Sequence, residues 1–278
     1  MEFNTSVLDL IKTRISSRTF KEIGIEEKAL EKLKAYITEL NGETRIKARF
    51  VLVNGDDAAT AQGKKLGTYG FIKGAGSFIV GILEKSEKDA LEFGYQFEKL
   101  VLFATDLGLG TCWLGGTFKK SDFEKSLSLK ESEFIPIVSP VGYATDKRRV
   151  TEAAMRTFVG AASRKPWSEL FFEGNIAKPL TEASAAPYAV PLEMVRLGPS
   201  ASNKQPWRVI KDEQGLHFYL CRTKGYGVPS YDVQLNDIGI AKCHFALAAK
   251  ELGLSGSWEK LENTTSTAQW EYVFSWVS

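Results

Sequence analysis

Histidine and cysteine, which carry most metal sites and much nucleophilic catalysis, are scarce in this chain. Of 278 residues only two are histidine, His217 and His244, and three are cysteine, with no CxxC spacing. His217 stands in an alternating apolar run and His244 in a helical one, so we interpret both as structural. We expect no metal site, no disulfide framework and a reducing cytoplasm. If the protein is an enzyme, a bound cofactor should supply its chemistry, because no catalytic side chain stands out.

A charge bias and long apolar runs are also absent. The chain has 36 Lys and Arg against 34 Asp and Glu, a net charge of +2, which favours neither nucleic acid nor a membrane surface. The longest uncharged apolar run, residues 74–83, is far shorter than the roughly 20 residues that span a bilayer. The first residues carry acids among the apolar positions, so we expect no signal peptide. The composition, 44% hydrophobic and 25% charged, is typical of a globular protein.

The chain does contain an internal repeat. Residues 94–113 match residues 239–258 at an offset of 145, with seven of twenty positions identical. Both copies have the apolar spacing of a buried helix and a glycine after the last apolar residue, where helices commonly end. Alternating apolar runs around the two copies predict strands. These strands are expected over 49–54, 77–83 and 134–143 in the first half and over 207–211, 216–221 and 270–278 in the second.

Each half therefore has the predicted order helix, helix, strand, strand, helix, strand. Strands and helices without strict alternation favour an α+β fold. Two related halves in one chain should pack as the subunits of a symmetric dimer do, around a pseudo-twofold axis. We place half one at residues 1–171 and half two at residues 172–278. The Ala-, Pro- and Ser-rich stretch 172–191 would form the surface crossover between them.

A candidate anion receptor follows the first predicted helix. Arg14 and Arg18 stand four residues apart with Ser16 between them. Guanidinium groups grip phosphate oxygens in a bidentate fork, and a hydroxyl can donate between them. Further cations, at 147–149 and 164–165, could support the same anion. The alternative for each cluster is a solvated basic surface.

Two further segments have the composition of ligand-binding loops. Residues 199–207 read Pro-Ser-Ala-Ser-Asn-Lys-Gln-Pro-Trp, in which small residues allow close backbone approach to a planar ligand and Ser and Asn can bond its edge. Pro206 fixes extended backbone before the following strand. Residues 110–116 place paired glycines just past the first repeated helix, again permitting close approach. The alternatives are an ordinary helix-to-strand loop and an ordinary helix end.

Together these segments resemble the FMN-dependent nitroreductase family, over almost the whole chain. Half one carries the arginine cluster but reads NGETRIKARF where Pro-Ser-x-x-Asn should stand. Half two carries Pro-Ser-x-x-Asn but reads NIAKPLTEA in place of the arginine cluster, and no Arg-Lys-Pro arm follows its last strand. The chain thus resembles the single-chain pseudo-dimer subgroup of the Thermotoga type. This resemblance implies a nitroreductase-like fold duplicated within one chain, with a single flavin site and a monomeric protein.

The resemblance also implies roles for particular residues. Arg14, Ser16 and Arg18 would hold the FMN phosphate with support from Arg164 and Lys165; Pro199, Ser200, Ala201 and Asn203 would line the ring from the other half; Leu114 and Gly115 would bring backbone near flavin N5. Ala201 stands where many members carry a hydroxyl, so one hydrogen bond to the flavin would be missing. No residue is expected to act catalytically by itself, because the flavin carries the chemistry.

The implied activity is ping-pong hydride transfer. NADH or NADPH would reduce FMN at N5, and a nitroaromatic, a quinone or a similar small-molecule acceptor would then reoxidise it. Two alternatives remain open at this point. One is an FMN-binding carrier or sensor without efficient turnover, and the other is a flavin-free scaffold.

Overall fold

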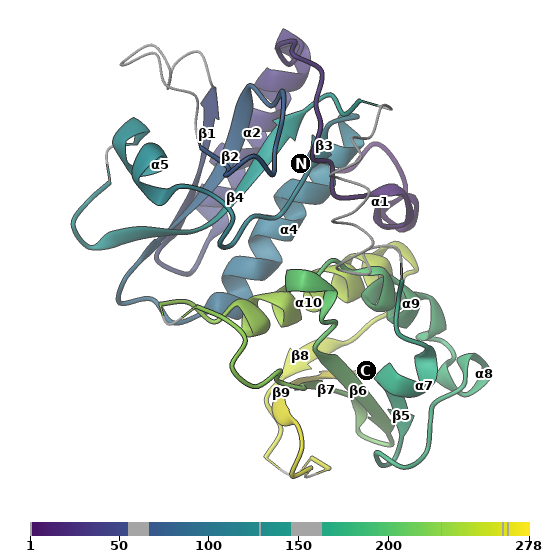
Figure 1. Cartoon of the computed structure of the whole chain (residues 1–278). Coiled ribbons are helices and arrows are strands. Elements are labelled where there is room, and N and C mark those ends of the chain that lie inside the picture. Colours follow the sequence, from purple (N-terminus) through teal and green to yellow (C-terminus); the bar gives the residue numbers. More distant parts are fainter. Residues whose placement is uncertain are drawn as a thin grey trace.

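Two β-sheets lie on either side of a pair of long helices that cross between them (Figure 1). The computed structural model describes residues 2–54, 67–127, 129–145, 163–228, 230–262, 264–265 and 267–278. None of the helices in these ranges is long and apolar enough to cross a membrane.

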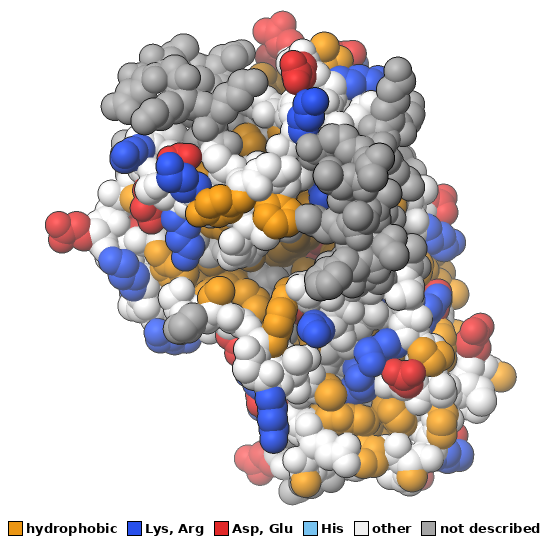
Figure 2. Space-filling view, in the orientation of Figure 1, with side chains coloured by type: hydrophobic (Ala, Val, Ile, Leu, Met, Phe, Trp, Pro, Cys, Tyr) orange, Lys and Arg blue, Asp and Glu red, His pale blue; other side chains and the backbone are white. Residues whose placement is uncertain are grey.

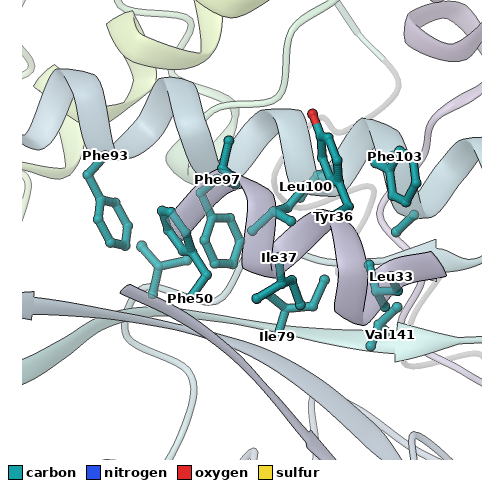
Figure 3. Packing of buried hydrophobic residues seen from close by; sticks show 14 of the residues in the cluster. Leu33, Tyr36, Ile37, Phe50, Ile79, Phe93, Phe97, Leu100, Phe103 and Val141 are labelled. Atoms are coloured by element: carbon teal, nitrogen blue, oxygen red, sulfur yellow. The ribbon is translucent and has the colours of Figure 1, made fainter. Parts of the chain in front are cut away.

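The first half is built on a four-stranded antiparallel sheet in the order β1-β2-β4-β3. Its elements are α1 (Val7–Thr13), α2 (Glu27–Glu43), β1 (Ala48–Asn54), β2 (Ser77–Glu84), α4 (Ala90–Asp106), β3 (Gly110–Thr111), α5 (Lys120–Ser126) and β4 (Glu133–Gly142). Figure 3 shows aromatic and aliphatic side chains of α2 and α4, among them Tyr36, Phe93 and Phe97, packed with Phe50 of β1 on this sheet. Full burial of such a side chain contributes about 1.5–3 kcal/mol, so this layer anchors the half.

The second half is built on a five-stranded sheet in the order β5-β6-β7-β9-β8. Its elements are α7 (Trp167–Leu170), β5 (Phe171–Glu173), α8 (Glu182–Ala185), α9 (Ala189–Leu197), η1 (Ala201–Asn203), β6 (Trp207–Asp212), β7 (Gly215–Leu220), α10 (Val233–Glu251), β8 (Ser257–Glu259) and β9 (Glu271–Val277). Without β5, its strand order β6-β7-β9-β8 repeats β1-β2-β4-β3 of the first half. The predicted α+β class and the duplication are therefore confirmed.

The strand β5 is where the two halves join. It pairs in parallel with β6, so the segment that passes the predicted boundary at 171 and 172 already belongs to the second sheet. The boundary itself stays a prediction. Three strands, β3, β5 and β8, were not predicted from the sequence, because strands of two or three residues are too short to show a periodicity.

The two repeated helices, α4 and α10, end in the same way. Leu109 N donates to Ala104 O and Leu254 N donates to Ala249 O, each at 2.9 Å, and these residues match at the offset of 145. The glycines before them, Gly108 and Gly253, have φ of 74° and 67°. Such left-handed conformations close a helix and favour glycine because it lacks Cβ. The predicted glycine stop is therefore present in both copies.

Glycines also set the crossing of α4 and α10. A Cβ atom on Gly94 would overlap the carbonyl of Asn236, and one on Gly239 would overlap the carbonyl of Leu91. Gly239 and Asn236 are the residues that match Gly94 and Leu91 at the offset of 145. The repeat therefore relates each of these two contacts to the other. Contacts that exchange in this way define a twofold interface. The two halves are therefore packed as a pseudo-twofold dimer.

This crossing yields a stability prediction. Replacing Gly239 by alanine should lower the free energy of unfolding by about 1–3 kcal/mol, because the added methyl group forces two rigid helices apart. Urea unfolding measures the change. Gly42, also helical, has open space around it, and Gly42→Ala should instead stabilise the protein by about 0.5–1 kcal/mol. Equal effects at the two positions would contradict the close packing.

Candidate active site

A cavity of about 530 Å³ opens between the two halves. This volume lies within the range of roughly 300–1,000 Å³ usual for small-molecule sites. The face shown in Figure 2 is hollowed between the halves, with hydrophobic side chains around the opening. The lining includes Arg14, Ser16, Arg18, Leu114, Gly115, Arg164, Pro199, Ser200, Ala201 and Asn203. The structure thus brings together ten of the eleven residues that the sequence analysis assigned to one site.

The arginine segment is positioned by strand-like contacts with the first sheet. Ser16 forms a bridge with Thr111 of β3, and Ser17 N donates to Thr111 O at 2.8 Å. Arg14 follows α1 directly and is only 7% exposed. Its Nε and Nη1 atoms, and Nη1 of Arg18, are buried without a hydrogen-bond partner in the described part of the chain. Buried donors left unsatisfied cost about 1–3 kcal/mol each, so a hydrogen-bond acceptor at this end of the cavity would be stabilising.

The opposing loop, residues 199–205, is held in a strained conformation. Ser202, Asn203 and Gln205 have φ of 46°, 54° and 49°, in the left-handed region that side chains disfavour. Such residues cost of the order of 1–3 kcal/mol each and persist only where their surroundings fix them. Ser200 Oγ accepts from Gln205 N at 2.9 Å, and Tyr226 donates to Ser202 Oγ at 2.8 Å. The loop is therefore a preorganised wall.

A segment from the end of half one fastens this loop. Arg164 Nη1 donates to Asn203 Oδ1 at 3.3 Å, and Asn203 Nδ2 donates to Ser163 O at 3.1 Å. The backbone N–H of Lys165 donates to Gln205 Oε1 at 2.8 Å. Lys165 does not line the cavity, and its Nζ lies 3.0 Å from Glu169 Oε2. Its support of an anion stays a prediction, and the basic cluster at 147–149 lies outside the described residues.

The backbone at Leu114 and Gly115 forms another wall. Leu114 N donates to Val138 O at 2.9 Å, and Leu114 O accepts from Val138 N at 3.0 Å. This backbone donor is thus already used within the first half. Gly115 also lines the cavity, and its N–H makes no hydrogen bond within the described residues.

Trp113, next to Leu114, is anchored by a buried pair of side chains from the two halves. Its Nε1 donates to Glu98 Oε2 at 2.9 Å, and Glu98 Oε1 lies 2.9 Å from His244 Nε2. Glu98 and His244 are both fully buried. His244 Nδ1 lies 2.9 Å from Met194 O and must be its donor, because a carbonyl only accepts. The structural interpretation of His244 therefore agrees with its contacts, as does that of His217, which lies between Ser275 and Asp212.

Two polar residues of α10 that line the cavity, Asn236 and Asp237, were not predicted from the sequence. Both are 2% exposed. Asn236 Oδ1 accepts from the Tyr231 hydroxyl at 2.7 Å, and Asp237 accepts from Ala201 N. Their sequence signal was present but weak: adjacent polar residues inside a helix that is otherwise largely apolar.

The pseudo-equivalent region of the other half is arranged differently. Adding or subtracting 145 relates the lining residues Trp113 and Ile240 to Trp258 and Tyr95. The ammonium of Lys242 lies 5.6 Å from the centre of the Trp258 ring and 5.7 Å from that of Tyr95. A cation stacked on aromatic rings thus stands where the first region presents an apolar wall.

The fold and the cavity define a duplicated nitroreductase-like α+β protein. The family described as "Putative TM nitroreductase" matches residues 6–249. The chain belongs to this nitroreductase family, a family of oxidoreductases. A search of curated proteins found no match.

A solved structure that matches the whole chain shows the same fold. A "putative nitroreductase" from Thermotoga maritima is 19% identical with a TM-score of 0.59, covering 100% of this chain and 95% of that chain. An FMN-dependent nitroreductase from Clostridium difficile is 21% identical with a TM-score of 0.39, covering 50% of this chain and 88% of that chain.

Proposed function

We propose that the protein is an FMN-dependent NAD(P)H oxidoreductase that passes electrons to a small-molecule acceptor such as a nitroaromatic or a quinone. The observation that carries the proposal is the set of orphaned guanidinium nitrogens of Arg14 and Arg18 at one end of the cavity. Buried cations without partners are expensive, and a phosphate would supply both the charge and the acceptors that they need. Membership of the nitroreductase family supports the same class of reaction.

The remaining residues of the cavity fit FMN. Arg14, Ser16 and Arg18 would hold the phosphate, while Pro199 to Asn203 would confine the ring from the other half. Gly115 would donate its N–H to the ring, and Trp113 and Ile137 would exclude water from its surroundings. Bound FMN supplies hydride chemistry between a nicotinamide and the acceptor. The chain's own contribution is therefore to bind, orient and desolvate, which explains a site without a catalytic histidine.

We infer that each chain holds one FMN and works as a monomer. Both halves contribute to the one cavity described above, so a second chain is not needed to complete it. In the region of the molecule that the repeat relates to this cavity, the Lys242 ammonium lies over the rings of Tyr95, Trp258 and Phe274.

The direct test is the absorbance spectrum of the purified protein, with flavin stoichiometry and size-exclusion chromatography. We expect a yellow monomer with one FMN per chain, bleached anaerobically by NADH or NADPH and recoloured by a quinone or a nitroaromatic. A yellow protein that neither nicotinamide bleaches would instead be a flavin carrier or sensor. A protein that binds no FMN on reconstitution would overturn the proposal altogether.

A further inference from the structure

Asp237 is a buried carboxyl group on the cavity wall to which the proposed cofactor contacts give no role. It is 2% exposed, and its Oδ2 and Oδ1 lie 3.0 and 3.2 Å from Ala201 N. One N–H group supplies only one hydrogen, whereas a carboxylate offers about four lone-pair positions. Most of the hydrogen-bonding capacity of Asp237 is therefore unused by the described residues.

No cation compensates this carboxyl group in the described part of the chain. The ion pairs formed there do not include Asp237. Arg14, Arg18 and Arg164 line the cavity among the described residues. Arg164 donates hydrogen bonds to Leu197 O and Asn203 Oδ1, whereas Arg14 and Arg18 have buried nitrogens without partners. A buried ion without a counter-ion costs several kcal/mol, and a carboxyl group avoids that cost by keeping its proton.

The electrostatic surroundings point the same way. Burial raises the pKa of Asp237 well above its usual range, the hydrogen bond from Ala201 N opposes this, and the nearby charge of Asp232 adds to it. Tyr231, which precedes α10, has a raised pKa for the same main reason, burial, and so stays neutral. A protonated Asp237 has an O–H group that needs an acceptor. Ala201 N–H cannot be that acceptor because it is itself a donor.

We propose that Asp237 binds the ligand as a neutral carboxylic acid, accepting the Ala201 N–H with one oxygen and donating the O–H of the other to an uncharged oxygen of the ligand. This inference rests on the proposed function and names the chemistry it requires: an oxygen acceptor conjugated to a ring. Two sources carry that chemistry, a carbonyl of the FMN ring and the carbonyl or nitro oxygen of the electron acceptor.

The test compares wild type with Asp237→Asn and Asp237→Leu. Asparagine keeps a neutral donor and an acceptor in nearly the same shape, whereas leucine keeps neither. Asp9→Asn, at an exposed position outside the cavity, is the matched control. FMN dissociation constants are measured on the apoprotein by fluorescence quenching, and KM is measured for a soluble benzoquinone.

If the acceptor oxygen belongs to FMN, leucine should weaken FMN binding tenfold or more and asparagine should restore most of the loss. If it belongs to the substrate, the FMN dissociation constant stays unchanged, and the benzoquinone KM rises tenfold or more with leucine but much less with asparagine. Unchanged values for both variants would overturn the ligand contact. Equal losses with asparagine and leucine would show that the charged form is the one that binds.

A second measurement needs neither FMN nor turnover. Unfolded aspartate has a pKa near 3.9, so above that pH only the folded state keeps the Asp237 proton. Wild type should then lose stability relative to Asp237→Asn as pH rises, by about tenfold in the unfolding constant per pH unit, until the folded-state pKa is reached. Parallel pH profiles would overturn the neutral acid. If the wild type binds no FMN, the proposed function fails, but this pH comparison still decides the protonation of Asp237.

Discussion

Replacing Arg14 by methionine is expected to stabilise the apoprotein and at the same time to abolish most of its affinity for FMN. Methionine fills much of the same space without the two buried nitrogens that lack partners, so the free energy of unfolding should rise by about 1–3 kcal/mol. Loss of a charge-assisted contact to phosphate should cost about 1.5–3 kcal/mol in binding free energy, which raises the FMN dissociation constant roughly 10- to 150-fold. Urea unfolding without ligand and FMN titration measure the two effects.

A variant with a general structural defect would lose both stability and FMN affinity, whereas Arg14→Met should gain stability and lose affinity. Arg18→Met should weaken binding similarly with a smaller gain in stability, because only one of its nitrogens is orphaned. Arg45→Met, on the exposed loop after α2 and away from the cavity, should change neither quantity. A destabilised Arg14→Met protein that still binds FMN at the wild-type level would show that this guanidinium is structural.

Removing Glu98 is expected to have the largest effect on stability. Glu98→Ala leaves His244 Nε2 without its partner in a fully buried place between the halves, and it leaves the partly buried Trp113 Nε1 without its acceptor. Breaking a buried pair on one side typically costs about 3–5 kcal/mol. Trp113 lines the cavity, so FMN affinity should fall as well. Urea unfolding and FMN titration report both losses.

Glutamine provides the matched control for this pair. Its carbonyl can accept from Trp113 Nε1 and its amide can donate to a neutral His244, whose other nitrogen donates to Met194 O. Glu98→Gln should therefore retain most of the stability that Glu98→Ala loses. The double variant Glu98→Leu with His244→Phe should be less destabilised than Glu98→Ala, because no buried imidazole is left unpaired. A glutamine variant as unstable as the alanine one would contradict this hydrogen-bond arrangement.

How far the site can be predicted depends on whether a residue's role is local. The arginine segment and the loop 199–203 are dense in unusual residue types, so each is recognisable in the amino-acid sequence. Asp237 is not, because its role comes from a contact with Ala201, 36 residues earlier in the chain. The pairing of Arg164 with Asn203 is equally invisible, since nothing near either residue in the sequence indicates the other.

Local patterns of residues specify the duplicated fold and the chemistry of the segments around the cavity. The helical spacing, the glycine stops and the alternating strands act within a few residues, and the match at an offset of 145 shows that they occur twice. Long-range contacts instead establish which arginine nitrogens lack partners, which backbone donor near Leu114 is already used, and that Glu98 meets His244, 146 residues away. Burial and desolvation sum over groups that meet only when the two halves close on each other, so no local pattern records them.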